Sequence, residues 1–343
     1  MLHGHGDDGY RAAREVKANF SSNVWYEGPH SLLLEELAAA VNEVGNYPEP
    51  AAESLTRDLA EQCNVRENQI LVCNGATEAF YLLAQVFAGA DSTIVVPAFA
   101  EYEDSCRIFN HPLSFRTYPE FWEMDPSRSG LVWLCNPNNP DGNLIPAGKL
   151  TRFIEEHPAL TFMVDESYVQ FSAGPQSVLG QINRLSNLVV VRSMTKYYAI
   201  PGLRLGYVAA SFQMIERLKA VKQPWSVNAL ALKAGQLILK HNLQAQRDLS
   251  KYLKITTGFM AQISEIEGFE PLPSATPYFL VKLSKGDSGR LKAFLLEEHG
   301  LLIRDASNFR SLDYQYIRVA TQTPEKNQLL INALKEWNRY ISY

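Results

Sequence analysis

Short apolar runs alternate with amphipathic segments over the first two thirds of the chain. The apolar runs, which predict buried strands, cover residues 70–73, 93–96, 131–135, 161–164 and 188–191. Runs of this length and composition are typical of strands that are covered on both faces. Apolar spacings of three and four residues predict helices at 31–41, 51–63, 74–87, 212–222 and 229–240. We therefore expect an α/β fold of repeated βα units with a mostly parallel sheet.

The last third of the chain has a different pattern. It predicts helices at 245–266, 288–299 and 324–341, mixed with strands at 278–282, 301–304 and 316–320. This mixture predicts a smaller α+β domain. Residues 1–30 are polar and weakly periodic, so we interpret them as an N-terminal arm that joins the small domain. The expected division is an arm at 1–30, a large domain at 31–235 and a small domain at 236–343.

Polar residues follow all five of the predicted strands, where ligands bind in parallel sheets. Gly75, Ala76 and Thr77 open a helix after the first strand, which suits a phosphate through free amides and the helix dipole, although an ordinary βα turn is the alternative. Asp165 follows another strand, where an isolated carboxylate is costly unless it is paired. Lys196 follows the predicted strand at 188–191.

Together these residues predict a site for pyridoxal phosphate (PLP). A lysine amine forms a Schiff base with its aldehyde, and a carboxylate pairs with its protonated ring nitrogen. Lys196 and Asp165 would have these roles. Ser193 and Thr195 suit the phosphate, and Tyr168 and Asn139 suit the phenolic oxygen of the cofactor.

Composition narrows the class of protein. The chain has 343 residues, of which 46% are hydrophobic and 20% charged, with a formal net charge of −5. This is ordinary for a globular protein and gives no general attraction to nucleic acid or anionic membranes. The start lacks an apolar run, and no stretch approaches the about 20 apolar residues of a spanning helix. We expect a cytoplasmic protein.

Metal binding is not expected. The four cysteines show no paired or zinc-like spacing, which favours reduced thiols. His3 and His5 lack acidic or thiol ligands nearby, and a metal site needs a full ligand set. An arm that brings glycine amides and His3 to an anionic ligand is the preferred interpretation.

Three motifs carry a resemblance to a known family. Residues 192–207 read RSMTKYYAIPGLRLGY, residues 136–142 read NPNNPDG, and residues 316–320 read YIRVA. They resemble the fold type I PLP-dependent aminotransferases and their decarboxylase relatives, with Asp141 where threonine is usual. The resemblance implies the aspartate aminotransferase-like fold, with Lys196 as the cofactor lysine and Arg204 as a phosphate partner. Arg318 would bind the substrate α-carboxylate.

Further roles follow from the same resemblance. The segment Asn46-Tyr47-Pro48 resembles the one that sends a tyrosine to the cofactor phosphate of a neighbouring subunit, which implies a homodimer with shared active sites. Tyr102, in the segment PAFAEY, is a candidate to stack on the cofactor ring.

Within the family, the details resemble most the L-threonine-O-3-phosphate decarboxylases of cobalamin biosynthesis, and next the histidinol-phosphate aminotransferases. Both resemblances imply a phosphorylated amino substrate. Arg304 is the candidate for its phosphate, with a structural ion pair as the alternative. Asn23 and the arm residue His3 would assist, and Asn139 would also face the substrate. After Asn23 the chain departs from the relatives, which have an Asn-Pro turn where this chain reads VWYEG.

The residues leave the reaction open. PLP weakens whichever Cα bond stands perpendicular to its ring, so the orientation of the substrate carboxylate decides between loss of CO2 and loss of a proton. We expect decarboxylation of L-threonine O-3-phosphate to (R)-1-aminopropan-2-yl phosphate. Transamination of histidinol phosphate is the alternative, and a PLP-binding protein without catalysis is a remote one.

Overall fold

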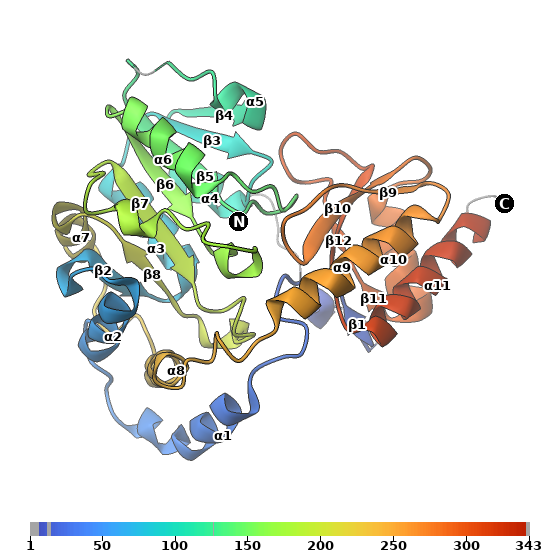
Figure 1. Ribbon diagram of the computed structural model, residues 1–343, viewed down its shortest axis with the longest axis horizontal. Helices are drawn as coiled ribbons and strands as arrows, with labels where there is room; N and C mark the ends of the chain where they lie inside the picture. The colour runs from blue at the N-terminus through green and yellow to red at the C-terminus, as the bar shows by residue number, and fades with distance from the viewer. Residues whose placement is uncertain (1–6, 12–14, 126, 341–343) are drawn as a thin grey trace.

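The computed structural model describes residues 7–11, 15–125 and 127–340. Figure 1 shows two lobes, one built on strands β2 to β8 and the other on β9 to β13. The strands are β1 Ala18–Asn19, β2 Ile70–Cys73, β3 Ser92–Val96, β4 Leu113–Thr117, β5 Gly130–Cys135, β6 Leu160–Asp165, β7 Leu188–Ser193, β8 Gly206–Ala209, β9 Phe269–Pro271, β10 Tyr278–Leu283, β11 Leu301–Leu302, β12 Arg304–Asp305 and β13 Tyr316–Ala320.

Helices surround both groups of strands. They are α1 Ser31–Ala39, α2 Glu53–Cys63, α3 Gly75–Val86, α4 Ala100–Ile108, α5 Tyr118–Phe121, α6 Ala147–Glu156, α7 Phe212–Lys219, α8 Ala229–Lys240, α9 Leu249–Ser264, α10 Ser288–His299 and α11 Pro324–Tyr340. None of those lying in the described ranges has the combination of length and apolar character that crossing a bilayer requires.

The larger sheet has seven strands in the order β2-β8-β7-β6-β5-β3-β4. Strands β7, β6, β5, β3 and β4 pair in parallel, whereas β8 runs antiparallel to both β2 and β7. The expected α/β fold with a mostly parallel sheet is confirmed. The strands at its centre are almost wholly buried, in agreement with their uninterrupted apolar sequence.

Several details differ from the sequence prediction. The predicted strand at 301–304 is divided between β11 and β12, which lie in different sheets, and helix α6 was not predicted. Strand β4 was not predicted either, and at the edge of the sheet its side chains are only partly buried or exposed. Helix α1 begins at Ser31, and its N-cap is the preceding residue. The cap is His30, whose Nδ1 accepts a hydrogen bond from the Leu32 N–H at 3.2 Å. An imidazole therefore replaces the usual hydroxyl cap.

The smaller sheet is antiparallel, in the order β12-β13-β10-β9. The N-terminal segment joins this lobe, because β1 pairs in parallel with β11 and Phe20 packs in the same apolar cluster as Phe279 and Leu295. The expected boundary at residue 235 falls inside α8, a helix that packs on α1 and α2. The three-part division of the chain stays a prediction.

Candidate active site

A cavity of about 470 Å³ lies where the carboxyl ends of the large-sheet strands face the small domain and the N-terminal segment. Its walls come from three parts of the chain. They include Thr77, Phe99, Asn139, Tyr168, Lys196 and Arg204 from the larger lobe, Arg304, Asn308, Arg310 and Arg318 from the smaller lobe, and Asp7, Ser21, Ser22 and Asn23 from the N-terminal segment. Residues far apart in the sequence therefore share one polar cleft.

Lys196 lies three residues after the end of β7. Its backbone carbonyl accepts a hydrogen bond from the Trp25 N–H at 3.0 Å, so the segment that departs from the relatives packs directly against it. Burial lowers the pKa of the Lys196 amine to about 8, and the charges of Arg204 and Arg318 add to the effect. An amine with such a pKa is partly neutral near physiological pH and can act as a nucleophile.

Asp165 ends β6 and is buried, level with Val191 of the neighbouring strand. Its carboxylate accepts hydrogen bonds from the Tyr102 hydroxyl at 2.5 Å and from the backbone N–H and hydroxyl of Ser167 at 2.8 and 2.5 Å. Burial raises the pKa of Asp165, whereas these hydrogen bonds oppose the rise. The three donors are neutral, so a cationic ring nitrogen beside this carboxylate would compensate for its burial.

The structure places Tyr102 beneath the cavity. The ring packs edge-on against Phe80 and is buried, and the hydroxyl is used by Asp165. Phe99, three residues earlier, is the aromatic residue of this segment that lines the cavity. The sequence analysis selected Tyr102 and not Phe99. Helix α4 begins at Ala100, which leaves Phe99 in the preceding turn and puts Tyr102 in the first helical turn.

The start of α3 forms a tight cradle with Arg204. Gly75 has φ +73°, and a Cβ atom there would lie only 2.5 Å from Arg204 Nη2. Gly206 is equally confined, since a Cβ would lie 2.7 Å from the Ala76 nitrogen, and it pairs with Ser193 across the sheet. The structure thus brings together the predicted phosphate-binding groups of three separate segments.

Hydroxyl groups lie beside this cradle, with Ser193 in the wall of a neighbouring cavity and Thr77 in that of the site. The Ser193 Oγ and Thr195 Oγ1 are 2.8 Å apart, and Ser193 Oγ accepts from the Thr195 N–H at 3.2 Å. Thr77 lines the cavity from the first turn of α3. A helix N-terminus, an arginine and hydroxyl groups suit the phosphate of PLP.

Arg318 and Asn139 form a second, fully buried group. Arg318 donates from Nη1 to Asn139 Oδ1 and from Nη2 to the Ser21 carbonyl. Burial lowers the pKa of Arg318 to about 10, and the charge of Arg304 contributes. Arg318 Nε and Asn23 Oδ1 are buried without a hydrogen-bond partner in the described part of the chain. Asn23 also donates weakly to Asn139 Oδ1, at 3.4 Å.

Arg304 is likewise buried and lines the same cavity. It donates from Nη1 to the Asp305 carbonyl and from Nη2 to Asn308 Oδ1, both at 2.8 Å. Burial lowers its pKa, although the nearby carboxylates of Asp305 and Asp8 oppose this. Its hydrogen-bond acceptors are neutral oxygens. The carboxylates of Asp305 and Asp8 offset part of its charge. The role of Arg304 in binding an anionic ligand stays a prediction.

The remaining predicted residues are placed as follows. Tyr168 lines the cavity, and burial raises its pKa. Tyr47 is 89% exposed and lies beside Trp225, away from the cavity of its own chain. His3 lies outside the described residues. Asp7, which the sequence analysis did not select, lines the cavity, and its carboxylate accepts a hydrogen bond from Asn19 at 2.6 Å.

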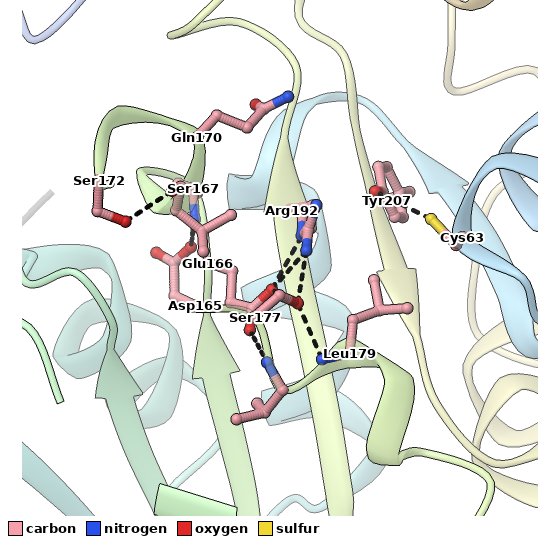
Figure 2. Close-up of polar contacts among 12 residues, drawn as sticks. Cys63, Asp165, Glu166, Ser167, Gln170, Ser172, Ser177, Leu179, Arg192 and Tyr207 are labelled. Atoms are coloured by element: carbon pink, nitrogen blue, oxygen red, sulfur yellow. Dashed lines mark hydrogen bonds and ion pairs between the residues drawn. The ribbon is translucent and has the colours of Figure 1, made fainter. Parts of the chain in front are cut away.

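A partly buried ion pair joins the ends of β6 and β7 (Figure 2). Glu166 accepts from Arg192 Nε at 2.9 Å and from the Ser177 hydroxyl at 2.7 Å. Arg192 in turn donates to Ser177 Oγ at 2.6 Å. Because Glu166 follows Asp165 and Arg192 precedes Ser193, this pair fixes the spacing between the two sides of the site.

Comparisons with known proteins agree with this geometry. Residues 15–334 match the family model described as aminotransferase class I and II. The structure of L-threonine-O-3-phosphate decarboxylase from Porphyromonas gingivalis superposes with a TM-score of 0.91 at 43% identity, over 94% of this chain and 99% of that chain.

Two histidinol-phosphate aminotransferases are also similar. The structure from Clostridium acetobutylicum has a TM-score of 0.87 at 26% identity, over 94% of this chain and 99% of that chain. The sequence from Thermoanaerobacter pseudethanolicus is 30% identical over 324 residues, 91% of this chain and 90% of that protein. The resemblance drawn from the motifs is confirmed.

Proposed function

Because the chain belongs to the class I and II aminotransferase family of PLP-dependent enzymes, we propose that it decarboxylates L-threonine O-3-phosphate. The products are (R)-1-aminopropan-2-yl phosphate and CO2. The observation that carries the proposal is the pair of buried arginines, Arg304 and Arg318, in the cavity that also contains Lys196. A substrate with a carboxylate and a phosphate would satisfy both. The 43% identity to a threonine-phosphate decarboxylase structure supports the same choice.

The residues of the site fit PLP. Lys196 would bind it covalently, Asp165 would face its ring nitrogen, and Phe99 would lie against its ring. The cradle of Gly75, Thr77 and Arg204 would hold its phosphate. When bound, PLP withdraws the electrons left on the substrate Cα after a bond breaks.

The protein residues then act on the substrate. Arg318 would bind the α-carboxylate, and Asn139 and the Ser21 carbonyl fix the orientation of its guanidinium. The orientation of this guanidinium would set that of the substrate carboxylate, and with it whether CO2 is lost. Arg304 would bind the phosphate. Lys196, with a pKa of about 8, would return the proton that replaces CO2 on Cα.

The N-terminal segment would close the site. Ser21, Ser22 and Asn23 line the cavity, and β1 ties this segment to the small domain. A homodimer is part of the proposal, because Tyr47 is exposed and would reach the cofactor phosphate of the partner subunit.

The assay is incubation of the PLP-loaded protein with L-threonine O-3-phosphate and detection of CO2. Release of CO2 without any keto acid is the expected result. The second candidate is transamination of histidinol phosphate with 2-oxoglutarate, which the similarity to two histidinol-phosphate aminotransferases supports. Turnover that requires a keto acid and releases no CO2 would reject the decarboxylase in favour of this activity.

A further inference from the structure

An ion pair between Arg310 and Glu103 crosses the cavity. Arg310, in the loop between β12 and β13, donates from Nε to Glu103 Oε2 at 3.1 Å and from Nη2 to Oε1 and Oε2 at 2.7 and 2.9 Å. Glu103 lies in α4 and is buried. The guanidinium also lies 3.9 Å from the ring centre of Phe115 on β4. The pair therefore attaches a loop of the small domain to the wall of the large domain.

The same loop holds Arg304. Asn308 Oδ1 accepts from Arg304 Nη2 at 2.8 Å, and the Phe309 ring lies 5.0 Å from the Arg304 guanidinium. Three consecutive residues of the loop therefore connect Arg304 to the large domain. Asn308 and Phe309 contact the anion-binding arginine, and Arg310 anchors the loop across the cleft. Displacement of Arg310 would release the two contacts that orient Arg304.

The strength of this attachment follows from its geometry. Exposed ion pairs contribute little to stability. Here the Arg310 side chain is 41% exposed, but the Glu103 carboxylate is buried and the contact is two-pronged, a geometry that is stronger and more directional. Glu103 has a second cationic neighbour, Arg107, at 2.6 Å on the same helix. Arg107 does not contact the loop in the described contacts of this pair, so its substitution is a matched control for the loss of a cation beside Glu103.

We infer that Arg310 and Glu103 are positioning residues, whose ion pair holds the loop of residues 308–310 so that Arg304 faces the phosphate of the substrate. The inference rests on the proposed function only in requiring a ligand with a phosphate at the Arg304 end. Neither Arg310 nor Glu103 takes part in the chemical step. Loss of the pair should weaken binding of the phosphate end and leave the carboxylate end unaffected.

The test compares two ligands that differ by one phosphate, L-threonine O-3-phosphate and L-threonine. Binding of each to the PLP-loaded enzyme is measured by the change in cofactor absorbance, and kcat and KM are measured with any ligand that turns over. We expect Arg310→Gln and Glu103→Gln each to weaken binding of the phosphorylated ligand about 10-fold, with kcat changed less than about twofold. Binding of L-threonine should not change. Arg310→Lys should recover part of the loss, and Arg107→Gln should behave like the unmodified enzyme.

Each other outcome overturns the inference. Equal weakening of both ligands would indicate a general structural role. Weakening by Arg310→Gln alone, with Glu103→Gln binding normally or more tightly, would indicate that Arg310 contacts the ligand itself. Equal affinity of the unmodified enzyme for the two ligands would show that the enzyme does not bind the phosphate. Absence of CO2 would reject the proposed decarboxylation alone. The comparison of binding would still test the role of the ion pair, because it does not depend on turnover.

Discussion

Arg304 and Arg318 are direct cross-strand partners, on the adjacent antiparallel strands β12 and β13. Both are buried, and the charge of Arg304 contributes to the lowered pKa of Arg318. Like charges at opposed positions of a sheet destabilise it. The sheet therefore holds two guanidinium groups in an arrangement that an anionic ligand would stabilise.

Ligand binding should consequently stabilise the protein strongly. At a concentration about 100 times its dissociation constant, L-threonine O-3-phosphate should add about 2.7 kcal/mol to the free energy of unfolding, seen as a rise in Tm. Arg304→Gln should lose most of this rise and keep the smaller effect of L-threonine. Identical Tm shifts in both proteins would show that Arg304 does not meet the phosphate.

The lowered pKa of Lys196 predicts the pH dependence of cofactor attachment. Only the neutral amine reacts with the PLP aldehyde, so the rate for the cofactor-free protein should rise with pH to a midpoint near 8. Stopped-flow absorbance between about pH 6 and 10 measures it. Arg318→Gln should move the midpoint upward, since a nearby positive charge is removed. Lys196→Ala should show no absorbance band at about 410–430 nm at any pH. A midpoint above about 10 would contradict the burial of the amine.

The same pKa has a consequence for stability. The folded, cofactor-free protein disfavours the charged Lys196, so between about pH 8 and 10.5 the unfolded chain binds more protons. The contribution of this residue to the free energy of unfolding should therefore rise with pH across that window. The measurement is denaturant unfolding of the cofactor-free protein and of Lys196→Met at several pH values. The free energy of unfolding of the unmodified protein should rise relative to that of Lys196→Met between about pH 8 and 10.5.

Tyr102 should act on the reaction through Asp165. Its hydrogen bond lowers the pKa of Asp165, so Tyr102→Phe should raise that pKa further and move the acidic limb of the kcat profile to higher pH. Asp165→Asn should reduce kcat by about 100-fold or more. Tyr118→Phe is the matched control, because the Tyr118 hydroxyl donates to the Cys135 carbonyl instead. Similar profiles for both tyrosine variants would argue against this role.

Gly75→Ala should weaken the cofactor site. The added Cβ would overlap the Arg204 guanidinium, and the positive φ would itself cost about 1 kcal/mol. We expect the dissociation constant for PLP to increase at least about 10-fold, as measured by equilibrium titration. Gly202→Ala has open space around the new Cβ and should titrate normally.

Mixed oligomers test whether Tyr47 serves a neighbouring site. Lys196→Ala and Tyr47→Ala should each be weakly active or inactive alone. After unfolding and refolding together, about half of the dimers would be mixed, and each would contain one complete site if the site is shared, which gives about a quarter of the normal activity. Absence of any recovery would show that Tyr47 does not serve the neighbouring site, and normal activity of Tyr47→Ala alone would place it outside the active site.

The sequence by itself determined the parallel core and supplied most of the candidate site residues. Runs such as residues 188–191 can be satisfied only when both faces are covered, and in a parallel sheet the residues that follow such runs meet at one edge. Lys196, Asp165 and the Gly75–Thr77 turn could therefore be assigned from local pattern. The resemblance carried by YIRVA and by residues 192–207 supplied the candidate roles of Arg318 and Arg204.

Only the tertiary structure decided how these groups face one another. The position of Phe99 in the cavity wall depends on where α4 begins, and the opposition of Arg304 and Arg318 depends on the register between β12 and β13. The Arg310–Glu103 contact joins residues 207 positions apart. Local propensity carries no information about such distances, because they are set by packing between domains. Hydrophobic periodicity specifies which face of an element is buried, but not which partner it meets.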